Sequence, residues 1–477
     1  MSFRLSRRSL GKLAAVTPFL PNTLQSGATP ETSTKPGDTA SAFAELSAWL
    51  DGQLESLGVP GAALGVIADG KFFTHTSGVV DSTAEDAIES TTAFRIASLT
   101  KIFTASATSK LAHAGQVDIT QPVVTYLPDF RVADTATSET VTTAHLLSHS
   151  GGWADSLEPD PTHEDLAYYV GEMRELPQVA PVGTHLSYSN SGYLLAGHLL
   201  ATLTGAEYEE VIRTNVLDPL GLGTTGFDSE GIEIGLVARG HSVGEDGAAP
   251  VESDVPPRAA NPSFGIRSSV DDLLIFLDSH LKAVHDTTSP FAGMLGPLGS
   301  GGAVGPSTVD HIGMGWMLRD INGHQVAMSQ GSDTGFCAAM AFAPADGFAI
   351  VVLTNSDAAL MLVNDLLWEG FTRILGLTEA EVVPIVLDDA ARSAATGTFA
   401  LWDGMAFETR DASGGLELTT SVGGEPVPDL TGSLGMTSEA LGFLNALGGQ
   451  VWFDFVQGDT GSIDWIRFAG RLAPRTI

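Results

Sequence analysis

The spacing of apolar and polar residues predicts a helix and a β-hairpin at the start of the regularly patterned part of the chain. Residues 41–58 carry apolar positions at the helical period, and Gly58 stands where a helix C-terminus favours glycine. Two short strand-like runs follow, at 62–69 and 71–78, with Gly70 between them. We therefore expect an antiparallel pair of strands directly after the first helix.

The middle of the chain is predicted to be mostly helical, and the region after it returns to strands. A helix is expected from Ser98 to Leu111, and helical spacing prevails from 141 to about 220. A helix is also expected over 357–376, and only strands appear after about 394. Between 311 and 355 the expected strands are "HIGMGWMLRD", "HQVAMSQ", "GFCAAMAFAP" and "GFAIVVLTN", with turn signals at Asn322-Gly323 and Asp346-Gly347.

This order of elements predicts an α+β fold. The first strands and the later meander would share one antiparallel sheet flanked by helices, and the helical middle would form a second lobe. Short strands with alternating polar and apolar residues predict a C-terminal all-β domain, either a small barrel or a sandwich. The main domain would span 41–385 and the β domain 390–477.

Residues 1–27 have the features of an export signal. Arg7 and Arg8 precede a short apolar run at 13–20, which is typical of a twin-arginine signal. Residues 28–40 are rich in Pro, Thr, Ser and Gly and predict a linker. The expected location is extracellular or at the cell surface, with the cytoplasm as the alternative. No run of about 18 apolar residues occurs, so no membrane-spanning helix is expected.

Acidic residues dominate the charge of the chain. There are 57 Asp and Glu against 23 Lys and Arg, which gives a formal net charge of −34 and a pI near 4.4. Carboxylates in such excess repel one another unless salt screens them, so we interpret the surface as an adaptation to molar salt. A moderately acidic protein from a low-salt source is the alternative. The same charge disfavours nucleic-acid binding and docking on an anionic membrane.

The low cysteine content excludes an intramolecular disulfide and a metal site built from several thiols. Cys337 is the only cysteine, so neither an intramolecular disulfide nor a thiol-rich metal site is available. We expect Cys337 to be a small buried residue on a strand. No metal-ligand spacing stands out elsewhere, and neither a metal nor another cofactor is expected.

A serine stands three residues before a lysine in three places, and context separates them. The pairs are Ser9/Lys12, Ser98/Lys101 and Ser279/Lys282. The first lies in the signal segment and the third in an acidic surface helix, so we interpret both as chance. On a helix, Lys101 would lie one turn after Ser98, in the same stripe as Ile102 and Ala105, and would point inward.

A buried lysine beside a serine can act as a base. Burial disfavours the ammonium form, and a base near neutrality needs a pKa about three units below the usual value. Ser98, at the helix start, would lie near backbone N–H groups that stabilise a developing oxyanion. Ser98 and Lys101 are therefore a candidate nucleophile and general base.

The segment "PVGTHLSYSNSGYLLAG" supplies candidates for the remaining steps. Tyr188 and Asn190 stand two residues apart before a helix that begins near Ser191, so both side chains can point into one cleft. Tyr188 could serve as acid and base, and Asn190 could hold the substrate or Lys101 by amide hydrogen bonds. Taken alone, the segment is more typical of an ordinary turn with a helix cap.

Seven segments occur in the order and at the spacings of a known superfamily. Over about residues 41–376 the chain resembles the serine β-lactamase, penicillin-binding-protein and esterase superfamily in its class C-like branch, which carries a Ser-x-x-Lys element. The segments are "FRIASLTK", "VTTAHLLSHSGGW", "PVGTHLSYSNSGYLLAGHLL", "DPLGLGTTGF", "FGIRSSVDDLLIFL", "GMGWML" and "GSDTGFCAAMAFAPADGFAIVVLTNS".

The resemblance implies a role for each candidate residue. Ser98 would be the acylated nucleophile, Lys101 its general base and Tyr188 the proton relay, with Asn190 beside it. The third element of the family, Lys-Thr-Gly or His-x-Gly, corresponds to Ser329-Gln330-Gly331, so the usual cation is absent.

Ser329 in place of the cation changes the expected substrate. In the family that cation binds a substrate carboxylate, so its loss favours neutral esters or amides over penicillins and D-Ala-D-Ala peptides. Gly331 is retained, and the N–H of Ser332 would be the second oxyanion donor. His145 and His149 match a structural helix-turn of the family, so we expect core or capping roles for them rather than a Ser-His pair.

The sequence therefore predicts a serine hydrolase that forms an acyl-enzyme with a small-molecule or peptide substrate, as an esterase, peptidase or β-lactamase-like enzyme. The alternative is a non-catalytic module for binding or assembly that keeps the fold, because Ser329 has replaced a needed cation. The C-terminal domain loosely resembles the lipocalin-like tail of some relatives, which serves assembly or shapes the cleft. It is the candidate surface for a homo-oligomer.

Overall fold

The structure is a computed structural model of the 477-residue chain, and it describes residues 38–155, 163–228, 236–244, 246–252, 255–412 and 414–476. The predicted export signal and most of the predicted linker lie outside the described residues. Within the described part, no helix combines the length and the apolar character that crossing a membrane requires.

A helix and a hairpin open the fold, which confirms the prediction for this region. Helix α2 spans Thr39–Leu57, and Gly58 ends it with a left-handed φ of 65°. Strands β1, Gly61–Ala68, and β2, Lys71–Gly78, pair antiparallel. All eight residues of β1 are buried, so this strand lies inside the sheet with both of its faces covered.

An eight-stranded antiparallel sheet forms the centre of the main domain, in the order β2-β1-β13-β12-β11-β10-β9-β8. Because β1 pairs with β13, the first and last strands of the domain share this sheet, as predicted. The further strands are β8 (Gly299–Val304), β9 (Ser307–Ile312), β10 (Met317–Ile321), β11 (His324–Asp333), β12 (Phe336–Ala343) and β13 (Phe348–Thr354).

The sheet departs from the sequence prediction near its β8 edge. The strand expected over 311–320 is instead the end of β9 and the start of β10, separated by a turn in which Gly315 has a φ of 80°. Strand β8 was not predicted, because its sequence GSGGAV lacks the alternation of side chains that identifies a strand. Pairing with β9 holds it in the extended conformation.

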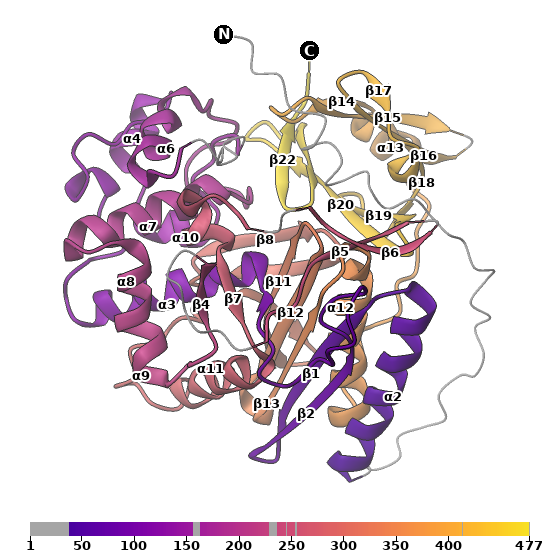
Figure 1. Ribbon diagram of the computed structural model, residues 1–477. Helices are drawn as coiled ribbons and strands as arrows, with labels where there is room; N and C mark the ends of the chain where they lie inside the picture. The colour runs from indigo at the N-terminus through magenta and orange to yellow at the C-terminus, as the bar shows by residue number, and fades with distance from the viewer. Residues whose placement is uncertain are drawn as a thin grey trace.

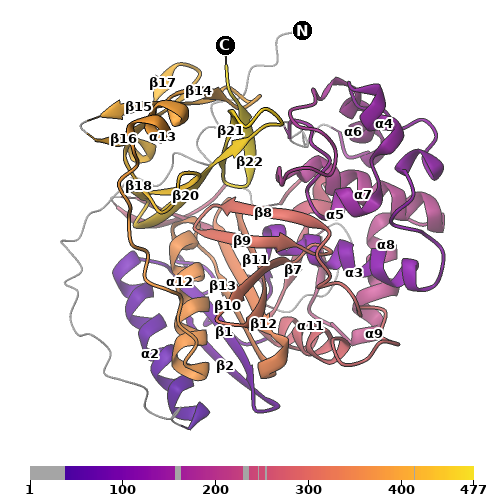
Figure 2. The same ribbon diagram turned by 180° about the vertical axis from the view of Figure 1, so that it is seen from behind.

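Helices cover both faces of this sheet (Figures 1 and 2). Helices α2 and α12, Leu360–Gly370, lie on one face, and α11, Val270–Ala283, lies on the other with the helical lobe beside it. Alternate residues of β13 enter the two cores: Val351 packs toward the lobe and Ile350 toward α2. The lobe contains α3 (Thr100–His113), α4 (Thr135–Thr140), α5 (Thr143–Leu147), α6 (Leu166–Glu172), α7 (Asn190–Thr204), α8 (Tyr208–Ile212), α9 (Asp218–Leu220) and α10 (Asn261–Phe264).

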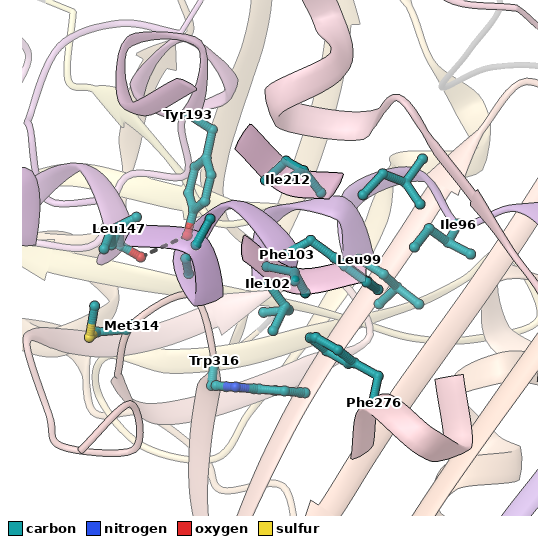
Figure 3. Packing of buried hydrophobic residues seen from close by; sticks show 14 of the residues in the cluster. Ile96, Leu99, Ile102, Phe103, Leu147, Tyr193, Ile212, Phe276, Met314 and Trp316 are labelled. Atoms are coloured by element: carbon teal, nitrogen blue, oxygen red, sulfur yellow. Dashed lines mark hydrogen bonds between the residues drawn. The ribbon is translucent and has the colours of Figure 1, made fainter. Parts of the chain in front are cut away.

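The core between lobe and sheet is built around α3, as Figure 3 shows. Phe103 of α3 stacks on Phe276 of α11 with ring centroids 4.2 Å apart. The hydroxyl of Tyr193 on α7 donates to the backbone oxygen of Leu147 at 3.0 Å. Most of α3 is buried, so packing on several sides fixes the position of its first turn.

The C-terminal region forms a nine-stranded antiparallel sheet that closes into a near-barrel, which confirms the predicted all-β domain. Phe399 pairs with Arg475, and this bridge joins the first strand of the sheet to the end of the last. Helix α13, Asp389–Ala395, precedes the strands and was not predicted. The strands are β14 (Gly397–Ala400), β15 (Met405–Ala412), β16 (Gly415–Val422), β17 (Glu425–Pro426), β18 (Gly432–Met436), β19 (Leu441–Ala446), β20 (Gly449–Gln457), β21 (Ile463–Phe468) and β22 (Arg471–Pro474).

The barrel sits against the β8 edge of the large sheet and beside the helical lobe (Figures 1 and 2). Strands β20 and β21 contact β8, and the indole N–H of Trp465 donates to the backbone oxygen of Val179 at 2.8 Å. The barrel therefore contacts both parts of the main domain.

Candidate active site

Ser98 lies in a single turn of 3₁₀ helix, Ala97–Leu99, immediately before α3. The predicted helix therefore begins later than expected, at Thr100. Ala97 has a φ of 45°, which is costly for a residue with a side chain and is tolerated only where the surroundings enforce it. The preceding strand β3, Phe94–Arg95, pairs with β7, Ile266–Ser268, and anchors this turn.

Lys101 points inward and contacts the candidate nucleophile. Its Nζ donates to Ser98 Oγ at 3.1 Å and to the backbone oxygen of Ser263 at 3.0 Å, and the residue is 2% exposed. Burial holds the pKa of Lys101 well below its usual value, and the Asp155 carboxylate opposes part of this shift. A neutral amine at this distance can accept a proton from the Ser98 hydroxyl.

Tyr188 completes the group around Ser98. The Lys101 Nζ lies 4.9 Å from the centroid of its ring, and the His149 ring stacks on it with centroids 4.2 Å apart. Burial raises the pKa of Tyr188 to about 12, while the nearby Ser98 hydroxyl and the Arg471 guanidinium act in the opposite direction. The phenol therefore keeps its proton at neutral pH and can donate it to a leaving group.

Asn190 is connected to Lys101 through a third residue. It is the first residue of α7, with Ser189 as the N-cap, and its Oδ1 accepts a hydrogen bond from Ser263 Oγ at 2.9 Å. Ser263 in turn accepts the hydrogen bond from Lys101 through its backbone oxygen. The amide of Asn190 thus helps to position the segment that holds the lysine.

The other three predicted site residues, Ser329, Gly331 and Ser332, lie on strand β11, which runs beside the 3₁₀ turn that contains Ser98. Gly331 lies against the 3₁₀ turn so closely that a Cβ there would be 2.9 Å from the backbone nitrogen of Ser98. Ser332, the next residue, is exposed, and Ser329 is buried. The glycine lets β11 bring the backbone of Ser332 beside that of Ser98.

The two histidines do not form a Ser-His pair. His145 Nδ1 accepts from the backbone N–H of Thr142 at 3.1 Å in a capping box. His149 Nδ1 accepts from the backbone N–H of Ser189 at 3.0 Å, and burial lowers its pKa to about 3. His149 is therefore neutral and supports Tyr188 by stacking.

Three residues of the site were not anticipated from the sequence: Asp155, Ser263 and Arg471. The side chain of Asp155 is 3% exposed and accepts from the backbone N–H of Ser191 at 2.9 Å and from Arg471 Nη2 at 3.2 Å. Asp155 closely follows the quoted segment "VTTAHLLSHSGGW", but no pattern of neighbours marks it. Within the described residues, no cluster of three or more His, Cys, Asp or Glu is arranged to hold a metal ion.

Replacing Gly331 by alanine tests the approach of β11 to the nucleophile. The added methyl would lie 2.5 Å from the backbone oxygen of Ile96, so the strand must move away from Ser98. We expect Gly331→Ala to lower kcat/KM for a p-nitrophenyl ester by roughly 10- to 100-fold. Gly52→Ala, whose Cβ meets nothing within 4 Å, is the control and should keep full activity. An unchanged rate in Gly331→Ala would contradict this geometry.

Comparison with known proteins identifies several similar chains. The Beta-lactamase family model matches residues 46–368. Penicillin-binding protein 4 of Amycolatopsis lactamdurans is 29% identical over 339 residues, which cover 68% of this chain and 88% of that protein. The crystal structure of SurE is similar with a TM-score of 0.73 and 21% identity, covering 92% of this chain and 100% of SurE. The octameric penicillin-binding protein homologue from Pyrococcus abyssi has a TM-score of 0.61 and 20% identity, covering 91% and 100%.

Proposed function

The chain belongs to the beta-lactamase family, and from this membership we propose that it is a serine hydrolase that forms an acyl-enzyme on Ser98. The observation that carries the proposal is the contact of 3.1 Å between the Ser98 hydroxyl and the buried amine of Lys101. Tyr188 and Gly331 lie beside this pair, so the residues of all three family elements meet at one point.

The proposed reaction uses each of these groups in turn. Ser98 Oγ attacks the carbonyl carbon of an ester or amide while Lys101 accepts the hydroxyl proton, and the backbone N–H groups of Ser98 and Ser332 donate to the oxyanion. Collapse of this intermediate breaks the bond to the leaving group, which takes a proton from Tyr188, and the ammonium of Lys101 returns a proton to the phenolate. Water then attacks the acyl carbon and gives a proton to Lys101. The bond to Ser98 Oγ breaks, and the serine takes that proton to regain its hydroxyl.

Ser329 shapes the proposed substrate class. A buried hydroxyl cannot form the ion pair with a substrate carboxylate that a lysine or histidine provides. We therefore propose a small-molecule or peptide substrate in which the scissile group is a neutral ester or amide. The same residue is the reason to keep a second candidate, a non-catalytic module for binding or assembly.

Covalent labelling separates the two candidates. A fluorophosphonate probe, added to the full chain in about 2 M KCl, should increase the mass of the tryptic peptide that contains Ser98. The label should be lost in Ser98→Ala and retained in Ser279→Ala, which alters the surface serine with the same spacing to a lysine. Labelling that survives in Ser98→Ala, or no labelling of the parent protein, would contradict the hydrolase.

Three observations on the wider molecule extend this proposal. The charge of −34 supports a protein that works in molar salt, and the signal-like residues 1–27 support export to the cell surface or beyond. The similarity to an octameric homologue over 91% of this chain supports assembly of this protein into a homo-oligomer, and we propose the C-terminal domain as the assembling surface.

A further inference from the structure

We infer that Arg471, carried by the C-terminal barrel, positions Tyr188 and brings a positive charge to the active site. The inference rests on the proposed hydrolase function and assigns a part of that function to the second domain. It would make the barrel a component of the catalytic centre.

The backbone around Tyr188 is held by the barrel. The Tyr188 N–H donates to the backbone oxygen of Gly470 at 2.8 Å, and Arg467 Nε donates to the backbone oxygen of Leu186 at 3.0 Å. Gly470 lies in the turn between β21 and β22 with a φ of 80°, and a Cβ there would be 3.0 Å from the Cβ of Tyr188. This turn can therefore approach the tyrosine only because residue 470 is glycine.

Arg471 follows this turn and extends from the barrel into the site. Its Nη2 lies 3.2 Å from Asp155 Oδ2, and its guanidinium carbon lies 5.5 Å from the centroid of the Tyr188 ring. Its Nε is buried and has no hydrogen-bond partner among the residues that the structure describes. The Asp155 side chain is 3% exposed and that of Arg471 29% exposed, and such an ion pair seldom adds much net stability. A partly unsatisfied guanidinium in this place therefore suggests a role beyond holding the domains together.

The charge of Arg471 acts on both proposed proton carriers. It lowers the pKa of Lys101, because a second cation nearby disfavours the ammonium form, and it lowers the pKa of Tyr188, because it favours the phenolate. Both effects bring the two groups closer to the pKa range in which protons are exchanged at neutral pH. The titratable and charged groups that face Lys101 and Tyr188 are Asp155, Asp333, His149, Tyr193 and Arg471.

The decisive experiment is the pH dependence of Ser98 labelling by the fluorophosphonate probe. Without the guanidinium, Lys101 becomes ammonium at a higher pH, so the acidic limb of the rate profile in Arg471→Met should move up by about one unit. The rate at neutral pH should then fall about tenfold. Arg471→Lys keeps the charge and should keep the limb near its original position.

Two further variants separate charge from packing. Arg475→Met removes a barrel arginine that lies 4.8 Å over Phe399 and bonds to the backbone of Ile463, so it should leave the limb unmoved. Asp155→Asn removes the carboxylate that raises the pKa of Lys101, so the limb should move to lower pH. Thermal unfolding of each variant verifies that it is folded, and if Arg471→Met does not fold, the other three variants decide.

Three outcomes would overturn the inference. The first is a folded Arg471→Met whose acidic limb stays at the pH of the parent. The second is an Arg471→Lys whose acidic limb moves as far as that of Arg471→Met, because a change of packing, without a change of charge, would then explain both shifts. The third is an Asp155→Asn with an unmoved limb. A parent protein that is unlabelled at every pH would instead refute the hydrolase proposal, so the two failures are distinguishable.

Discussion

Replacing Ser98 by alanine is expected to lower the turnover of p-nitrophenyl esters by at least about 10³-fold. The variant loses the hydroxyl to which the buried amine of Lys101 donates at 3.1 Å, while the backbone donors remain. Folding should stay intact, because Ser98 is partly exposed and its removal leaves little cavity. Steady-state rates and thermal unfolding, measured on the same preparation, test both statements.

The control for this variant is Ser279→Ala, which should match the parent in both measurements. Its hydroxyl donates to the backbone oxygen of Phe276 at 2.6 Å within α11, far along the chain from the 3₁₀ turn. A Ser98→Ala protein that hydrolyses esters as fast as the parent would remove the basis for a covalent mechanism.

Replacing Lys101 by methionine should lower kcat/KM about 10²- to 10⁴-fold and leave stability unchanged or raised. Methionine fills the space of the lysine stem, and it removes a cation that burial disfavours. Lost activity together with undiminished stability would indicate that the buried amine is kept for function rather than for folding.

The pH dependence of stability gives this variant a second signature. The folded pKa of Lys101 is depressed, so between that pKa and about 10.4 the unfolded chain binds more protons than the folded protein. The free energy of unfolding of the parent should therefore gain a rising contribution with pH in this window, and Lys101→Met should lose that contribution. Chemical denaturation at a series of pH values measures it, with Lys282→Met as the control at an exposed lysine paired with Asp278.

Much of the fold could be predicted because its signals are local. The hairpin of β1 and β2, the turn at Asn322-Gly323 and the helix over 41–58 each follow from residues within a few positions of one another. The family resemblance, which seven ordered segments indicated, is confirmed by the match over residues 46–368. Strand β8 was missed because its glycines adopt an extended form only through pairing with β9.

The residues of the candidate site also fall into two groups, those that local sequence could predict and those that tertiary packing brings in. Ser98 and Lys101 lie one turn apart, so helical spacing alone brings them together, and the prediction of an inward-pointing amine agrees with the contact in the structure. Ser263 and Arg471 reach the lysine and the tyrosine through tertiary packing, and nothing in their own neighbourhoods marks them. The strain at Ala97 is equally invisible in the sequence, because alanine gives no sign of a φ of 45°.

The hydrogen bond from Tyr188 to Gly470 has a consequence for biosynthesis. Ribosomes deliver the main domain before the barrel, and domains of this size fold largely as units in the order in which they emerge. Until residue 471 has been translated and the barrel has closed, the tyrosine lacks its carbonyl anchor and its neighbouring guanidinium. A nascent chain of this protein therefore holds Tyr188 without these two contacts until translation is complete and the barrel has folded.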